Sequence, residues 1–366
     1  MSALGPDTAS GVAALQAGRR GLAPAARSPH LVPVAGAPPV VGEVPLDLPL
    51  PLRARGIVAR AVAEAMEKAG SASGPTGVFV GTTAGFFVDA EVDLLAARRH
   101  DPRAMPAFGQ RGPGEVAEAV ATQVGADGPV LTFSMACTSS AAATLAALRH
   151  LQQGRCDRAV VVGFDPLSSL SIHGFRSLLL VDPLPCRPFC ATRAGLQLGE
   201  GAGVLVLERG DGPFRVLGGA NRIDTSNLTA SATDGSTVER VVRAALADAG
   251  VTAAEIASIK AHGTGTVDND LAEGRGLVRT FGDPPPFVSL KGALGHTLGA
   301  AGALEIALWL GCLTAGFLPA SPGFGEPDPS IGARPLTAPI PAPRGAHLFD
   351  AFGFGGSCVA IVVADA

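Results

Sequence analysis

The chain has 366 residues, of which 47% are hydrophobic and 16% are charged, and its formal net charge is −4. This length predicts two domain-sized units or one fused double unit, and the near-neutral charge excludes a nucleic-acid stripe or a polybasic membrane patch. The six cysteines are irregularly spaced, with no signal segment and no membrane-length apolar stretch, so we expect a soluble protein of the reducing cytoplasm.

The predicted elements of the first half alternate between helix and strand. A short helix is expected at residues 10–17, and an amphipathic helix at residues 51–70 ends at Gly70. Further along, a helix is predicted at 115–125 and another directly after Cys137, and the predicted strands are 77–83, 129–136, 156–165 and 201–208. This alternation is typical of a mainly parallel sheet covered by helices.

The second half shows the same alternation of predicted helices and strands. Helices are predicted at 237–250, from about Asn269 and within 295–316, and strands at 258–266, 285–293 and 356–366. Each half contains a strand, a turn with a potentially reactive residue and an Ala/Gly-rich helix. We therefore predict an internal duplication, with an N-terminal half at 1–209 and a C-terminal half at 210–366.

Cys137 lies between an apolar strand and an alanine-rich helix. Free backbone N–H groups and the positive end of the helix dipole favour thiolate there, so we expect a lowered pKa and a nucleophilic role. The alternative is a structural cysteine, since most free cysteines are small core residues and this chain has five others. Cys186 and Cys190 lack a second pair of ligands, so no metal site is predicted.

Two histidines also occupy strand ends. His262 begins HGTGTVDND and His296 lies within KGALGHTLGAAG, so each follows a predicted strand and precedes a Gly-rich segment. A strand can hold the ring rigidly, while the glycines leave room for a substrate. Two imidazole N–H groups aimed at one carbonyl oxygen would stabilise an enolate, and a thiolate would hold an acyl group. Either histidine alone would be interpreted as structural.

Taken with ACTSS at 136–140 and FGFGG at 352–356, these motifs resemble the elongating β-ketoacyl-ACP synthases of the thiolase superfamily. The resemblance covers nearly the whole chain. It implies a thiolase-like α/β fold, with two pseudo-duplicated βαβ halves in a layered αβαβα sandwich. It also implies a decarboxylative Claisen condensation, in which malonyl-ACP extends a carrier-bound acyl chain held as a cysteine thioester.

The resemblance assigns three catalytic residues. Cys137 is implied as the acylated nucleophile, and His262 and His296 as the two active-site histidines. Lys291 and Glu273 match a family Lys–Glu pair that supports the histidines, and their alternative is an ordinary ion pair.

Three further residues are assigned supporting roles. Thr264 and Thr266 are implied to contact the pantetheine arm, although threonines beside glycines are often only turn formers. Phe354 matches the family's gating phenylalanine, and its backbone N–H would join that of Cys137 in an oxyanion hole. A structural β-turn is the alternative for this loop.

The same resemblance implies partners rather than cofactors. The substrates travel on the phosphopantetheine arm of an acyl carrier protein, so the implied partners are this carrier protein and a second subunit. That subunit gives a homodimer or a heterodimer with a related ketosynthase or chain-length factor. No metal, nucleic acid or membrane is implied.

Several positions depart from the family pattern. The family usually has aspartate at the positions of Cys190 and Ala194, and asparagine at that of Cys358. These replacements put in doubt whether this chain forms the family's ion-pair network in the loop. The chain also begins inside the family's first strand, and its loops around 100–115 are short. Compact synthases of aryl-polyene and related pigments share this trimming, which suggests a polyenoyl substrate.

Two alternative functions stay open. A chain-length-factor-like subunit would fit the replaced residues, although such partners usually lose the cysteine that this chain keeps. A thiolase or acyl hydrolase on the same fold is disfavoured, because the sequence has no second cysteine motif.

Overall fold

The computed structural model describes residues 1–28, 30–31, 38–101, 103, 112–226 and 231–366. The first of its two large sheets has the strand order β4-β3-β5-β6, in which β4, β3 and β5 are parallel and β6 is antiparallel. Its strands are β3 (Thr76–Gly81), β4 (Val130–Phe133), β5 (Arg158–Asp165) and β6 (Gly201–Glu208). The outer face is covered by α2 (Leu50–Ala69) and α4 (Gly114–Val124).

The second large sheet has the strand order β7-β13-β12-β8-β9. Here β12 is parallel to β8, and β13 is antiparallel to both of its neighbours. Its strands are β7 (Phe214–Ile223), β8 (Ile256–Lys260), β9 (Phe287–Val288), β12 (Ala346–Phe352) and β13 (Ser357–Asp365). The helix α7 (Ser236–Ala249) packs on β7 and β13, and α8 (Val267–Phe281) packs on α7.

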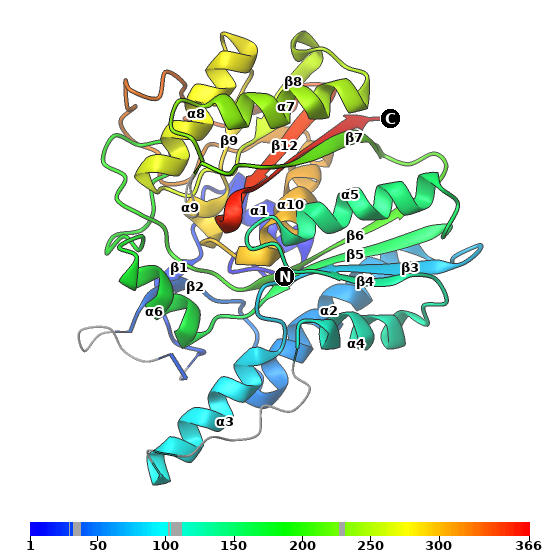
Figure 1. Ribbon diagram of the computed structural model, residues 1–366, viewed down its shortest axis with the longest axis vertical. Helices are drawn as coiled ribbons and strands as arrows, with labels where there is room; N and C mark the ends of the chain where they lie inside the picture. Colours follow the sequence, from blue (N-terminus) through cyan, green and yellow to red (C-terminus); the bar gives the residue numbers. More distant parts are fainter. Residues whose placement is uncertain (29, 32–37, 102, 104–111, 227–230) are drawn as a thin grey trace.

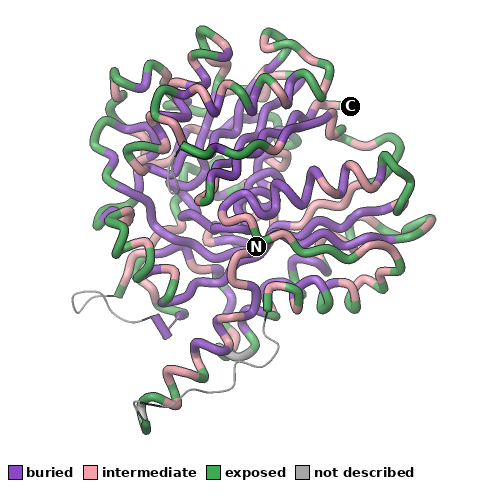
Figure 2. The backbone as a smooth tube through the Cα atoms, viewed as in Figure 1, coloured by how far each residue is buried: buried purple, intermediate pink, exposed green. Residues whose placement is uncertain are grey.

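Two helices separate the sheets and complete a five-layered molecule (Figure 1). They are α5 (Ser139–Gln152) and α10 (Ala301–Thr314), and each contacts strands of both sheets. Buried backbone concentrates in these helices and in the strands on either side (Figure 2). The layered αβαβα arrangement expected from the sequence is confirmed. The site loops therefore start from elements that are held on two sides.

The remaining elements are short or peripheral. They are α1 (Thr8–Gln16), β1 (Leu22–Pro24), β2 (Val40–Gly42), α3 (Phe87–His100), α6 (Ser169–Ser177), α9 (Lys291–Leu294), β10 (Phe317–Leu318) and β11 (Ile340–Pro341). Single turns of 3₁₀ helix occur at 253–255, 298–300 and 354–356. Within the described part of the chain, no helix is long and apolar enough to cross a membrane.

Most predicted elements are present, but several boundaries differ. The strand predicted at 258–266 ends at Lys260, so His262 lies in a loop, and the strand predicted at 285–293 covers only Phe287–Val288. The sequence interpretation missed α3, α6, β7 and β12. Most of the short loop region at 100–115 falls outside the described residues.

Glycines let α5, α10 and β3 approach one another closely. A Cβ atom on Gly302 of α10 would lie 2.4 Å from the backbone N of Ala141, and one on Gly81 of β3 would lie 2.2 Å from that of Ser140. The Ala303 N–H also donates to Ser140 Oγ at 3.0 Å. We call these contacts the glycine seam. Because no side chain fits there, the seam fixes the first turn of α5 against both neighbours.

We expect Gly302→Ala to lower the free energy of unfolding by about 1–3 kcal/mol, because the methyl group would overpack the seam against backbone. Gly174→Ala in α6 is the matched control, since its Cβ would meet nothing within 4 Å. That variant should be neutral or more stable by about 0.5–1 kcal/mol. Denaturant unfolding measures both, and equal stability of the two variants would contradict the seam.

Candidate active site

Cys137 lies in a strained turn between β4 and α5. The preceding residue, Ala136, has φ of +50°, which is unfavourable for a residue with a side chain. Ser139 braces the turn, because its Oγ accepts from Met135 N at 2.9 Å and donates to Ala136 O at 2.6 Å. Cys137 itself is 5% exposed. The turn therefore holds the thiol in one fixed, buried place.

The expected low pKa of Cys137 is wrong for the resting protein. The helix begins at Ser139, and burial raises the pKa of the Cys137 thiol to about 12. Lys291 and the backbone N–H groups of Phe354 and Cys137 oppose this rise, because they interact favourably with the charged sulfur. Desolvation outweighs them, so the resting group is a thiol.

The two predicted histidines lie together. The His262 and His296 rings are 5.4 Å apart between centroids, at 85° to each other. Lys291 Nζ lies 3.3 Å from His262 Nδ1, and Leu298 N donates to His296 Nδ1 at 3.3 Å. Both Nδ1 atoms are therefore acceptors, and these hydrogen bonds assign the proton of each neutral ring to Nε2.

Both imidazoles are neutral at physiological pH. Burial, reinforced by the charge of Lys291, lowers the pKa of His262 and of His296 well below the usual range. The Nε2 atom of His296 is buried and has no hydrogen-bond partner among the described residues. The site thus presents a buried N–H donor that no other described group of the protein occupies.

Lys291 does not pair with Glu273, which corrects the predicted ion pair. Its Nζ lies 2.8 Å from Glu305 Oε1 and donates to the backbone oxygen of His262 at 2.7 Å. Lys260 also pairs with Glu305. Glu305 thus lies between two lysines, and Lys291 supports both the ring and the backbone of His262.

Glu273 instead supports the histidine loop through its backbone. His262 N donates to Glu273 Oε1 at 2.6 Å, and Gly263 N donates to Oε2 at 2.7 Å. Asp350, which the sequence interpretation did not select, accepts from the same His262 N–H at 2.8 Å. It lies in β12, two residues before the FGFGG motif, and that proximity was the only signal for it.

The FGFGG loop connects the cysteine and the histidines. The Phe352 ring lies 5.8 Å from that of His262, and Gly353 lies against the backbone of Cys137. Thr138 Oγ1 donates to Ser357 Oγ at 2.7 Å, which ties the start of α5 to β13. The FGFGG loop thus contacts both Cys137 and His262, and the charge of Lys291, which lies beside His262, also acts on the Cys137 sulfur.

Phe354 is half-buried and stacks on Phe175 of α6, with ring centroids 5.4 Å apart. Its backbone N–H faces the Cys137 sulfur. Gly355 and Gly356 follow with φ of +78° and +81°, a conformation in which a side chain would be strained.

Thr264 and Thr266 hydrogen-bond each other at 2.8 Å between their hydroxyl oxygens. Thr264 is buried and Thr266 is half-buried, in the loop that follows His262. Their predicted contact with pantetheine stays a prediction.

The loop contains ion pairs built on Arg193, to which the side chains of Cys190 and Ala194 contribute no charge. The Arg193 guanidinium pairs with Asp328 at 2.6 Å and donates to the Cys190 oxygen at 3.0 Å. Ala194 is exposed, and Cys358 is buried with its thiol bonded to Gly356 O at 3.4 Å.

Asp165 is a further buried carboxyl beside Cys137 that the sequence interpretation missed. It ends β5 and accepts hydrogen bonds from residues 82–84 and from Gly299 N, the last at 2.6 Å. Burial raises its pKa to about 6. It joins the loop after β3 to the segment after His296.

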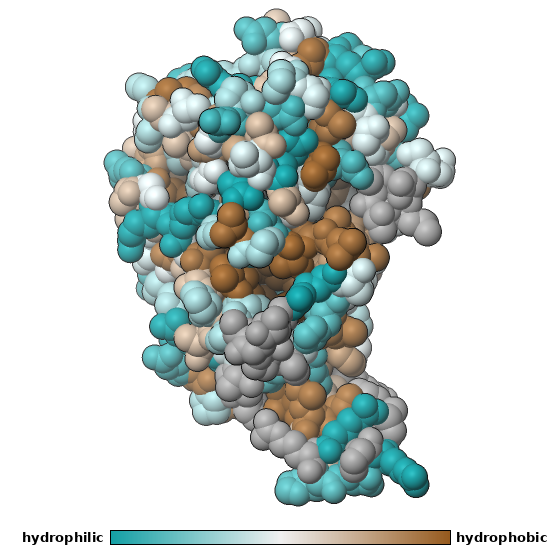
Figure 3. Space-filling model, turned by 90° about the vertical axis from the view of Figure 1, so that its left-hand side faces the viewer, coloured by the Kyte–Doolittle hydropathy of each residue, from teal (hydrophilic) through white to brown (hydrophobic). Residues whose placement is uncertain are grey.

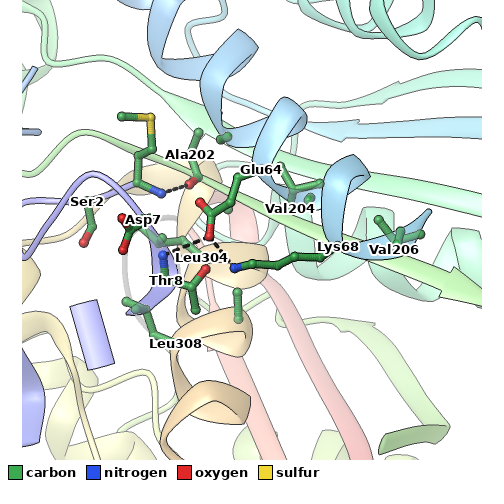
Figure 4. Close-up of a pocket in the computed structure, with 16 residues that line it drawn as sticks. Ser2, Asp7, Thr8, Glu64, Lys68, Ala202, Val204, Val206, Leu304 and Leu308 are labelled. Atoms are coloured by element: carbon green, nitrogen blue, oxygen red, sulfur yellow. Dashed lines mark hydrogen bonds and ion pairs between the residues drawn. The ribbon is translucent and has the colours of Figure 1, made fainter. Parts of the chain in front are cut away.

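A cavity of about 280 Å³ lies away from these residues, between α2, β6 and α10 (Figure 4). Glu64, one of its lining residues, accepts from Lys68 at 2.6 Å and from Thr8 N at 3.2 Å. The Met1 amine donates to Ala202 O at 2.8 Å, and burial lowers its pKa to about 6. None of the predicted site residues lines this cavity, so it is separate from the candidate active site.

The chain matches two family models that meet near its middle. The model of the β-ketoacyl synthase N-terminal domain matches residues 54–212, and that of the C-terminal domain matches residues 215–324. Nodulation protein E of Rhizobium meliloti is 34% identical over 259 residues, a match that covers 67% of this chain and 64% of that protein. The chain therefore matches slightly under two thirds of that relative's length.

Two further proteins extend the similarity. The chloroplastic 3-oxoacyl-[acyl-carrier-protein] synthase I of Hordeum vulgare is 32% identical, over 80% of this chain and 67% of its own length. A chain of the ketosynthase ApeO in complex with its chain length factor ApeC, from Xenorhabdus doucetiae, superposes with a TM-score of 0.85. It is 29% identical, and the match covers 100% of this chain and 96% of that one.

We expect the rate of Cys137 alkylation by iodoacetamide to rise about tenfold per pH unit up to about pH 10 without a plateau, because a pKa of about 12 keeps the thiolate fraction small. Mass spectrometry of the Cys137 peptide measures this. Cys190 is the control, because it is also buried but has a lowered pKa: desolvation raises the pKa of its thiol, and hydrogen bonds with Thr192, Gly325 and Glu326 together outweigh that rise. A plateau for Cys137 near neutral pH would contradict the raised pKa.

Proposed function

Because this chain belongs to the β-ketoacyl synthase family, we propose that it extends a carrier-bound acyl chain by decarboxylative Claisen condensation with malonyl-ACP. The observation that carries the proposal is the buried cluster of one thiol and two neutral imidazoles. Cys137 is the nucleophile, and His262 and His296 are the donors that stabilise the enolate. The substrates arrive on phosphopantetheine, so the reaction needs no cofactor of this chain's own.

Acylation uses the strained turn at Cys137. The thiol loses its proton, Sγ attacks the thioester carbonyl of the incoming acyl group, and the carrier thiol leaves with a proton. The negative oxygen formed during this attack is stabilised by the backbone N–H groups of Cys137 and Phe354, which face the sulfur. Because these donors belong to the backbone, this half-reaction depends little on the histidines.

Condensation uses the two imidazoles. The malonyl group loses carbon dioxide, and the charge that develops on its thioester oxygen is stabilised by the Nε2–H groups of His262 and His296. The resulting carbon nucleophile attacks the acyl carbonyl, the carbon–carbon bond forms, and the bond to Sγ breaks. The Cys137 thiolate then takes up a proton.

The loop after His262 and the surface beside α6 fit the carrier arm. Thr264 and Thr266 offer hydroxyl groups for the amides of pantetheine. A band of apolar surface crosses the face of the molecule on which α6 lies (Figure 3). Leu170 of α6 and Leu179 just after it are 64% and 87% exposed. Exposed apolar surface of this kind supports docking of a protein partner.

A second subunit would cover the edge of the first sheet. The strand β4 is its outermost strand, and Val130 and Leu131 are 41% and 37% exposed. A cavity of about 410 Å³ adjoins this edge between β4, α5 and β7. An exposed apolar edge strand favours pairing with another chain, so we propose a dimer through β4.

We expect His262→Ala and His296→Ala to slow malonyl decarboxylation by about 100- to 1000-fold, because each removes a donor to the developing charge. Self-acylation from acyl-ACP should fall less, since its donors are backbone N–H groups. Cys137→Ala should take up no acyl group. Intact-protein mass spectrometry and carbon dioxide release separate the two half-reactions.

Cys156→Ala is the control, because Cys156 is a buried thiol in a separate apolar cluster. It should acylate like the wild type. Equal losses in both half-reactions for the histidine variants would contradict the proposed division of roles.

The second candidate is a chain-length-factor-like subunit with little activity of its own. It is supported by the structural similarity to a ketosynthase–chain length factor complex and by the replaced residues Cys190, Ala194 and Cys358. The resemblance to compact pigment synthases supports a polyenoyl substrate for either candidate.

We expect the protein expressed alone to form a dimer in solution, because β4 exposes an apolar edge. Mass measurement by light scattering, with condensation assays in the presence and absence of a co-expressed homologue, tests this. Full activity of a homodimer would reject the chain-length-factor candidate. Activity only with the homologue would support it, and a fully active monomer would contradict the dimer.

A further inference from the structure

Two buried carboxyl groups meet beneath the backbone of His262. The His262 N–H donates to both Glu273 and Asp350, at 2.6 Å and 2.8 Å, and both side chains are 0% exposed. Glu273 belongs to α8 and Asp350 to β12, so the contact joins two elements at the start of the histidine loop. Because both oxygens accept from the same N–H, the two carboxyl groups lie close against each other.

A hydrogen bond between two carboxyl groups requires a proton, because an ionised carboxylate has only acceptors. Two adjacent charges in a buried place would repel strongly. Burial raises the pKa of Asp350 to about 6 and the pKa of Glu273 well above its usual range. The pair thus titrates as a unit, in two coupled steps.

The surrounding charges indicate how many protons the pair holds. Lys260 of β8 and Lys291 of α9 share the single carboxylate of Glu305 of α10, so one positive charge is left over. A pair with one proton carries one negative charge and balances it. Two other titratable neighbours, His262 and His296, are neutral, and Asp270 of α8 lies 4.0 Å from Arg193, which also pairs with Asp328.

We propose that Asp350 is a positioning residue for His262, and that it shares a single proton with Glu273 in a pair that fixes the His262 backbone. The inference rests on the proposed function. Loss of the proton places two carboxylates in contact and pushes β12 from α8. A second proton removes the negative charge that holds the His262 N–H and leaves the lysines uncompensated. The position of His262 therefore depends on pH.

The hydrogen bonds show which variant tests this. Both Glu273 oxygens accept backbone N–H groups, from His262 and Gly263, so Glu273→Gln leaves one of these groups facing an amide NH₂. Only one oxygen of Asp350 accepts from the backbone, and its Oδ2 has no other partner among the described residues. Asp350→Asn keeps that acceptor and offers an amide N–H in place of the shared proton.

The first measurement is the pH profile of malonyl-ACP decarboxylation between about pH 5.5 and about pH 9.5. We expect Asp350→Asn to stay within about threefold of the wild type near neutral pH and to have a flatter profile, because the single carboxyl of Glu273 replaces the coupled pair. Glu273→Gln should lose about tenfold or more at every pH, because a buried backbone N–H loses its acceptor.

The second measurement is the melting temperature, which does not depend on activity. Because both folded-state pKa values are raised, the folded protein keeps protons that the unfolded chain releases above about pH 4, and this stabilisation is lost as the pH rises through the raised values. The Tm of Asp350→Asn minus that of the wild type should therefore rise by about 2–4 °C between about pH 5 and about pH 9.

Asp211→Asn is the control, because Asp211 is exposed and lies outside the carboxyl pair, so the Tm trend should be specific to Asp350→Asn. Superimposable rate profiles and a constant Tm difference for Asp350→Asn would overturn the proposal. If the wild type shows no decarboxylation, the Tm trend still decides whether the proton is shared. Failure of the proposed function is thereby distinguished from failure of the carboxyl pair.

Discussion

The close approach of α5 and α10 is the constraint on which the site depends. Without Cβ atoms at Gly81 and Gly302, the first turn of α5 lies directly against β3 and α10. One helix follows Cys137 and the other follows His296, so the separation of the helices sets that of these two residues. An added methyl group anywhere in the seam would move one half of the molecule relative to the other, because packed interiors do not compress. The relative positions of Cys137 and His296 are therefore set by Gly81 and Gly302, which have no side chains.

Burial governs the electrostatics of the cluster in a consistent direction. It keeps the Cys137 sulfur protonated, keeps both imidazoles neutral, and raises the pKa of Asp165 to about 6. The thiol and the two imidazoles therefore carry no charge at rest, and in the proposed reaction charge develops on sulfur or on the enolate oxygen. Donors that are already oriented stabilise such transient charge without reorganisation. Lys260 and Lys291 place positive charge beside His262. Glu305 pairs with both lysines and so compensates part of this buried charge.

The sequence predicted what depends on local pattern and missed what depends on packing. Cys137 was selected from a predicted strand end before an Ala-rich segment, and the histidines from Gly-rich motifs. In the structure His262 lies in the loop after β8 and His296 follows α9, and the catalytic roles of all three stay predictions. The partner of Lys291 was not predicted, because Glu305 lies in α10 and only the packing of α9 and α10 brings the two side chains together. The direction of the Cys137 pKa shift was wrong, because desolvation cannot be judged from a helix start alone. Strand β7 was missed because two adjacent glycines interrupt its apolar pattern, and Asp350 was missed with β12, whose end was interpreted only as a loop motif.

The contact between Thr138 and Ser357 joins residues 219 positions apart, and 125 positions separate Cys137 from His262. Closing such distances is entropically costly and comes late, because local helices and hairpins form without it. During refolding, helix content and compact size therefore return before the groups of the site meet. Until the two sheets dock on α5 and α10, Cys137 does not lie beside the histidines and the Phe354 backbone. For the proposed reaction, activity regained during refolding therefore reports the late docking of the two sheets.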